Sequence, residues 1–203
     1  MTNQTSTRAT RDQRRQRKQQ QEQKSRIISG LLIAAVLSLI GYLVWNGLSN
    51  PPLGDAIPVT GEGVHVPNGN PLPQYATDPP TSGGHYETAL PAGFYDTTSP
   101  EATTLPNPQG FIVHSLEHGY VVFWYNCALL ASDAECETLK ASLQATMATY
   151  NNFKIIAFPW ASTDVPVVAT SWGRMLKFEA WDAELAAQFI ERNRNHAPEN
   201  QAP

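Results

Sequence analysis

The chain has 203 residues, 41% of them hydrophobic, which suffices for one ordinary domain with attached segments but not for two large domains. Its formal net charge of −4 hides a division: residues 1–26 carry eight Lys or Arg and two acidic side chains, whereas the rest carries 6 basic and 16 acidic ones. We interpret the basic tail as a topogenic signal with affinity for anionic lipid, and we expect no nucleic-acid partner.

Residues 1–26 have almost no apolar side chains, so we expect a disordered basic tail on the cytoplasmic side. Residues 27–48 contain no charge. As a helix this run would be about 33 Å long, enough for a hydrocarbon core of roughly 30 Å. Tyr42 and Trp45 lie near its distal end, where aromatic rings favour the membrane interface. The sequence therefore predicts one transmembrane helix over 27–48.

The basic residues before this helix predict its orientation. Because cytoplasmic flanks are enriched in Lys and Arg, we expect a single-pass cell-membrane protein with a cytoplasmic N-terminus and an extracytoplasmic C-terminal domain. A cleaved signal peptide is the alternative. Its apolar stretch is usually about 7–15 residues and ends at a small-residue site, whereas residues 45–52 offer no good Ala-x-Ala site. A retained anchor is the preferred interpretation.

Beyond the helix we expect a linker over 49–61, an α+β domain over 62–199 and a short tail over 200–203. Twelve of the chain's 16 prolines lie between residues 50 and 108, which indicates a proline-rich segment that wraps over the later core. The later pattern predicts a mixed sheet with two helices on one face. The expected elements are a strand from 111 to a kink or turn near 117–119, strands at 120–125 and 153–158, a hairpin at 166–171 and 174–179, and helices at 133–150 and from 182.

Four of the five histidines lie next to Gly, Pro or an expected strand end, in the first two-thirds of the predicted domain. Neutral imidazole is the commonest metal ligand, so His65, His85, His114 and His118 predict a copper or zinc site. Three interpretations are open for Glu117: a further ligand, a partner that fixes the tautomer of a ligand, which we prefer, and a solvent-facing charge. The alternative is that the histidines are structural and bind loop backbone.

His114-Ser-Leu-Glu-His118 also matches H-x-x-E-H, the inverted zinc-protease pattern. That motif requires a helix, on which both rings face the metal and the glutamate acts on a bound water. The flanking β-branched and aromatic residues favour a strand here. We therefore expect no peptidase and name no catalytic residue.

Cys127 and Cys136 are the only cysteines, nine positions apart, at the expected end of a strand and start of a helix. An extracytoplasmic location permits oxidation, so a local disulfide is the first interpretation. A metal-binding thiolate pair or a redox couple remains open, although neither has C-x-x-C spacing.

Several stretches together resemble a known family, the bacterial domain-of-unknown-function family 3105. They are Pro79-Pro-Thr-Ser-Gly-Gly-His85, Val113-His-Ser-Leu-Glu-His-Gly119 with Val121-Val122, and Trp172-Gly173-Arg174 followed by Asp182 and Phe189-Ile190. The resemblance covers residues 65–199 and implies a single-span membrane protein whose domain lies outside. His85, His114, Glu117 and His118 match its motif positions, but the resemblance implies no activity.

These observations give two hypotheses. The first is a membrane-anchored, extracytoplasmic domain that binds copper or zinc through clustered histidines. The second is a non-catalytic cell-envelope module that binds an envelope protein or membrane complex and uses its histidines structurally. The element order also resembles a trimmed thioredoxin fold, which is analogy alone without a C-x-x-C motif.

Overall fold

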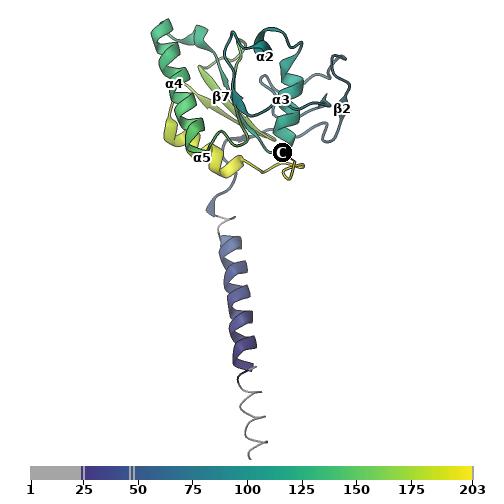
Figure 1. Cartoon of the computed structure of the whole chain (residues 1–203), viewed down its shortest axis with the longest axis vertical. Coiled ribbons are helices and arrows are strands. Elements are labelled where there is room, and N and C mark those ends of the chain that lie inside the picture. The colour runs from purple at the N-terminus through teal and green to yellow at the C-terminus, as the bar shows by residue number, and fades with distance from the viewer. Residues whose placement is uncertain (1–23, 25, 46, 48, 203) are drawn as a thin grey trace, which may run out of the picture. The chain divides into compact units, whose positions relative to one another are not determined.

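The computed structural model describes residues 24, 26–45, 47 and 49–202, so the predicted disordered tail lies largely outside the described residues (Figure 1). The described chain divides into two units, Met1–Pro51 and Pro52–Pro203. In the first unit, Arg26–Trp45 is a 20-residue helix that is long and apolar enough to cross a membrane, and its side chains are exposed. A signal sequence near the N-terminus can also meet these criteria of length and composition.

The second unit is built on a mixed sheet in which six described strands follow the order β1-β8-β7-β5-β6-β4. The strands are β1 Asp55–Ala56, β4 Gly93–Phe94, β5 Val121–Tyr125, β6 Ile155–Pro159, β7 Val167–Ser171 and β8 Arg174–Phe178. Strand β5 is central and fully buried, and it pairs in parallel with β6 and antiparallel with β7. The mixed α+β fold is thus confirmed, and so are the strand near 120–125 and the hairpin across 166–179.

Two helices cover one face of this sheet, as predicted. They are α4, Asp133–Thr149, and α5, Ala183–Asn193. Each begins at a side-chain cap: Ser132 Oγ accepts from the Glu135 N–H, and Asp182 Oδ1 accepts from the Leu185 N–H. Their apolar side chains pack with Val121, Phe123 and Tyr125 of β5, whose period of two directs them to this face.

The opposite face is covered by α3, Pro108–Glu117, so the prediction that helices lie on one face only was wrong (Figure 1). The predicted strand from residue 111 to a bend near 117–119 was also wrong. Residues 110–117 are buried on every side of the helix, because α3 lies between the sheet and the wrapping segment. Tertiary burial therefore outweighs the strand preference of its β-branched and aromatic residues.

The ends of α3 carry ordinary helix signals. Pro108 is the first helical residue, where its missing N–H costs no hydrogen bond. Gly119 follows the C-terminal cap with φ +86°, a conformation that favours glycine. Its N–H donates to the Leu116 carbonyl, and the Tyr120 N–H donates to the Ser115 carbonyl, which is the Schellman pattern. The glycine therefore ends a helix rather than interrupting a strand.

The proline-rich segment wraps over α3. Its two short strands, β2 His65–Val66 and β3 His85–Tyr86, form a separate parallel pair, and α2, Pro100–Thr103, is a single turn. Part of the segment expected as a linker over 49–61 belongs to the packed unit, since β1 pairs with β8 and the Leu53 N–H donates to Asn193 Oδ1. The packed unit begins near Pro52.

The order β8-β7-β5-β6 has a parallel crossover through α4 between β5 and β6, and α5 follows the β7–β8 hairpin. The likeness to a trimmed thioredoxin fold that the sequence suggests stays a prediction. The likeness is one of topology and carries no function.

Candidate metal centre

Two of the predicted ligands are brought together by the parallel pair β2 and β3. His65 and His85 occupy paired positions in its register, so their side chains lie side by side on one face. Their ring centroids are 4.8 Å apart. His85 is fully buried, whereas His65 is exposed, so the pair spans from the interior to the surface.

The third imidazole comes from α3. His114 Nδ1 lies 2.7 Å from the carbonyl oxygen of Tyr86, the residue that follows His85 on β3. The His114 ring lies 4.9 Å from the rings of both His65 and His85. Each of the three residues offers a ligand atom, and these atoms all lie within 4.8 Å of one another. Three remote parts of the chain thus meet in one cluster.

The buried rings are oriented by backbone carbonyls. A carbonyl oxygen only accepts, so His114 Nδ1 carries the proton that it donates to Tyr86. His85 Nδ1 donates in the same way to the Gly83 carbonyl at 2.8 Å. In both neutral rings the lone pair is then on Nε2. Metal-binding histidines in proteins are held in this manner, with the second nitrogen bonded to a carbonyl or carboxylate.

Glu117 lies beside His85, and both side chains are fully buried. Its Oε1 accepts a hydrogen bond from the Gly63 N–H at 2.7 Å, and its Oε2 lies 3.0 Å from His85 Nε2. Neither of these two facing atoms has a hydrogen-bond partner of acceptable geometry among the described residues. Because a neutral Nε2 and a carboxylate oxygen are both acceptors, this contact calls for a positive charge, either a proton or a metal ion.

The donor set fits a transition-metal ion. Zinc–nitrogen bonds of about 2.0–2.1 Å in tetrahedral geometry place neighbouring ligand atoms about 3.3 Å apart. The three imidazole ligand atoms, within 4.8 Å of one another, need a modest approach, and exposed His65 has the freedom to make it.

The electrostatics of His114 favour its metal-binding form. Burial, together with the nearby rings of His118, His85 and His65, lowers the pKa of His114 below its usual value of 6.5, despite the hydrogen bond to Tyr86. His114 therefore stays neutral at neutral pH, with a lone pair available on Nε2.

The loop that carries His85 is firmly packed. Residues 79–86 are all buried. Gly83 has φ +139°, and a Cβ added there would lie 2.6 Å from the Tyr75 ring. Ser82 Oγ accepts a hydrogen bond from the Thr60 N–H, so this hydroxyl holds the loop to the chain before it. The packed loop therefore holds His85 in a fixed position.

His118, the remaining predicted ligand, lies outside the first group. It caps the end of α3, and its ring centroid is 4.5 Å from that of His114. With His114 and Glu199 it forms a second group that could hold an ion. The sequence reasoning missed Glu199, which follows a polar run without a recognisable motif.

The H-x-x-E-H stretch is helical up to Glu117, so the strand argument used to set aside a peptidase was wrong. Geometry supplies a different argument. In such enzymes the glutamate acts on water held by the metal of the two histidines. Here the Glu117 carboxylate is buried and turned to Gly63 and His85. The two carboxylate oxygens thus contact groups that lie outside the H-x-x-E-H stretch.

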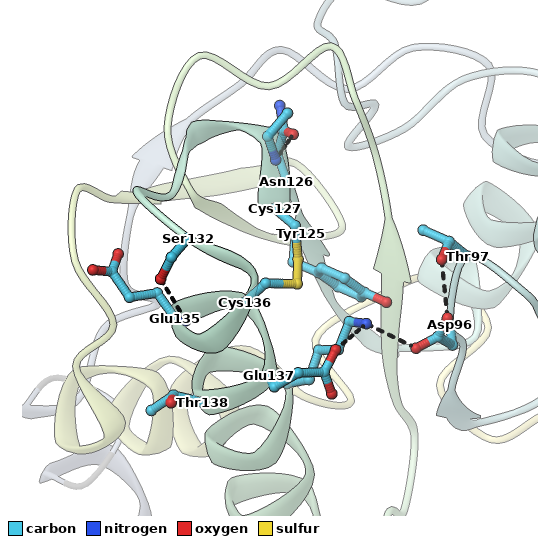
Figure 2. Close-up of a disulfide and its surroundings, with 12 residues drawn as sticks. Asp96, Thr97, Tyr125, Asn126, Cys127, Ser132, Glu135, Cys136, Glu137 and Thr138 are labelled. Carbon is cyan, nitrogen blue, oxygen red and sulfur yellow. Dashed lines mark hydrogen bonds and ion pairs between the residues drawn. A yellow bond between two sulfur atoms is a disulfide. The ribbon is translucent and has the colours of Figure 1, made fainter.

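The cysteines lie on the other side of the sheet. Figure 2 shows Cys127 beside Asn126 at the end of β5, joined to Cys136 in the first turns of α4 by a disulfide. Their Cα atoms are 5.2 Å apart. Cys127 packs against the core cluster shared by α4 and α5, so the pair does not belong to the histidine cluster.

A comparison with known families finds one whose match covers residues 65–203. The chain belongs to the family described as protein of unknown function (DUF3105). This confirms the resemblance inferred from the sequence motifs. The DUF3105 region begins at His65 and contains all five histidines and both cysteines. No curated protein and no solved structure matches the chain.

Proposed function

We propose that this chain is a membrane-anchored protein whose extracytoplasmic DUF3105 region binds one transition-metal ion, copper or zinc, through His65, His85 and His114. Glu117 lies beside the ion and compensates part of its charge. The protein acts as a carrier, sensor or assembly factor rather than as an enzyme.

One observation carries this proposal: three imidazoles converge from three segments, and the buried His85 Nε2 faces an equally buried Glu117 Oε2. Structural histidines usually satisfy both nitrogens with hydrogen bonds. Here the Nδ1 atoms of both buried rings are bonded to backbone carbonyls, which leaves Nε2 of each ring as the atom available to an ion. A bound cation satisfies this arrangement.

The test measures metal content of the full-length protein in detergent micelles, purified without a polyhistidine tag. The protein is stripped with a chelator, loaded separately with Zn²⁺ and Cu²⁺, and passed over a desalting column. We expect about one equivalent of metal per chain to remain after desalting. His85→Gln and His114→Gln should each remove most of it. His196→Gln is the matched control, since His196 is exposed and lies outside both histidine groups, and it should bind like the wild type.

Wild-type protein that retains far less than one equivalent of either metal would contradict the proposal. It would favour the second candidate, an envelope interaction module with structural histidines. That candidate draws support from two surface cavities of ≈ 350 and ≈ 470 Å³ that share Trp160 and contain no histidine in their lining.

A further inference from the structure

The two histidine groups share one residue, His114. The first group joins it to His65 and His85, and the second joins it to His118 and Glu199. His114 has only one lone pair to offer, because its Nδ1 proton is donated to the Tyr86 carbonyl at 2.7 Å. A single lone pair binds one metal ion at a time, so the two groups exclude each other at His114.

Each group has one exposed member, His65 in the first and Glu199 in the second, but the first has two buried histidines, whereas the second has only His114 buried. His85 and Glu117 are fully buried at the inner end of the cluster. In the second group the His118 side chain is 13% exposed and that of Glu199 is 46% exposed. An ion held by the second group would sit nearer to solvent and would keep more of its bound water.

The position of Glu199 is built into the fold rather than left to a loose tail. Its own N–H donates to the Glu117 carbonyl at 3.0 Å, and the Asn195 N–H donates to the Gly119 carbonyl at 2.8 Å. The Lys154 ammonium group donates to the His118 and Asn200 carbonyls, at 2.9 Å each. These bonds fasten the C-terminal segment to the end of α3, and Glu199 Oε2 lies 3.5 Å from His118 Nε2.

The donor sets also differ. The inner group offers three imidazoles, and the outer group offers two imidazoles and a carboxylate. A carboxylate suits an ion that is still partly hydrated, whereas imidazoles suit Cu(II) and Zn(II) strongly. An ion that moves from the outer to the inner group would therefore exchange a carboxylate and bound water for imidazole nitrogens.

We propose that His118 and Glu199 form, with His114, a solvent-facing exchange site through which the same single ion enters and leaves the inner site. This inference rests on the proposed function and adds a route to it. His114 changes partners rather than position: it binds the ion first with His118 and Glu199, and then with His85 and His65.

The test follows the rate of metal loading and release. Stripped full-length protein in micelles is mixed with Co²⁺, whose visible absorption reports ligation, and release is started by adding excess chelator. His118→Gln, Glu199→Gln and the double variant are compared with wild type and with His196→Gln. Each single variant should slow loading and release about tenfold, in the range typical for removing a group next to a metal. The final occupancy should stay at about one equivalent.

Because Gln keeps the size of Glu and the backbone bond from residue 199 is untouched, folding should be preserved, and thermal unfolding of each variant checks this. Three results would overturn the exchange site. These are unchanged rates in both single variants, two equivalents bound by wild type, or complete loss of binding in His118→Gln, which would make the outer group the main site. Unchanged rates leave the proposed function standing, whereas no binding by wild type overturns both.

Discussion

At the level of single residues, the contact between His85 and Glu117 is unusual. Two buried acceptor atoms lie 3.0 Å apart without hydrogen-bond geometry, and their other polar atoms are fixed by Gly83 and Gly63. Burying a carboxylate is costly unless a positive charge compensates it. Either a proton or a bound metal ion shared by the two atoms would compensate this carboxylate.

Glu117→Gln tests the role of that charge. The amide oxygen can still accept from the Gly63 N–H, so the variant removes the charge and little else. We expect metal affinity to fall about 10- to 100-fold, as it does when groups beside metal ligands are changed. A competition titration against a chelator of known affinity measures this. Equal affinity in the variant would mean that Glu117 serves the fold and not the ion.

His114 gives a prediction for pH. Its pKa is lowered in the folded state, mainly by burial, so the unfolded chain binds more protons in the window from about pH 6.5 downward. The stability associated with neutral His114 is present above about pH 6.5 and is lost as pH falls through the lowered pKa. We expect metal-free protein to unfold more easily at pH 5.5 than at pH 7.5, and His114→Gln to show a smaller difference.

The measurement is thermal unfolding in micelles with chelator present, monitored by tryptophan fluorescence. It gives the difference in unfolding temperature between pH 5.5 and pH 7.5 for wild type and for His114→Gln. His196→Gln, which alters an exposed histidine, should retain the wild-type pH dependence. An equal pH dependence in wild type and His114→Gln would mean that His114 does not cause the loss of stability at low pH.

At the scale of elements, α3 shows where sequence reasoning reached its limit. The strands and helices after residue 120 follow from periodicity and caps, because each has one face on the core and the pattern records it. Helix α3 is buried on all sides, so it has no polar face to reveal its period. Pro108 and Gly119 were the available signals for its ends.

The histidine cluster could likewise be predicted only in part from the sequence. The histidine types and the spacing of His114 and His118 predicted metal ligands, but the pairing of His65 with His85 depends on a two-residue strand contact. No local pattern encodes a register between segments twenty residues apart. Glu199 was missed for the same reason, since it reaches His118 only through the folded C-terminal segment.

Close approach of α3 to β3 depends on Gly110. A Cβ at this position would lie 2.6 Å from Tyr86 Cδ2 and 2.7 Å from Leu72 Cδ1. Gly110→Ala gains up to about 1 kcal/mol of helix propensity but incurs overpacking of about 1–3 kcal/mol. We expect a net loss of about 1 kcal/mol in the free energy of unfolding and weaker metal binding, because His114 is held by the Tyr86 carbonyl.

Denaturant unfolding and a metal titration on the same sample check both effects. Gly93→Ala is the matched control, because a Cβ there would make only ordinary contacts at 3.7 Å with the Tyr95 ring. If Gly110→Ala stabilises the protein, α3 and β3 can move apart enough to accommodate a Cβ at this position.

A disulfide and a pair of ion pairs hold the N-terminal half of α4 in place. The disulfide joins Cys136 to Cys127 (Figure 2). The Lys140 ammonium group bridges Asp96, at 3.0 Å, and Glu137, at 2.9 Å. Its hydrogen bond to Asp96 lowers the pKa of that carboxyl to about 2. Because these side chains are partly solvated, the covalent link contributes more than the ion pairs.

Replacing both cysteines by serine should lower the free energy of unfolding by about 2–3 kcal/mol, the chain-entropy value for a loop of this size. Metal occupancy should not change, because the pair packs on the α4 face and not against the histidines. Denaturation of the double variant, and of wild type with and without reductant, measures the stability. Lost metal uptake in the double variant would instead point to cysteine ligands.

For the whole molecule, the apolar helix Arg26–Trp45 and the charge asymmetry around it carry the proposed location. The eight basic side chains in residues 1–26 favour retention of the N-terminus in the cytoplasm. A metal site outside the cytoplasm would meet ions in an oxidising compartment, where the bond between Cys127 and Cys136 also persists.

Protease added to intact spheroplasts should therefore degrade the C-terminal region, and the same region should be protected in inside-out vesicles. The protein should remain with the membranes after high-salt washing, and its mass should include residues 1–48. A shorter, membrane-free product would identify residues 27–48 as a cleaved signal sequence.

Replacing the basic residues of the tail by Gln should increase the fraction with the opposite orientation, because Lys and Arg near the helix set its direction while neutral side chains do not. An unchanged orientation in that variant would mean that the helix is directed by other features of the chain.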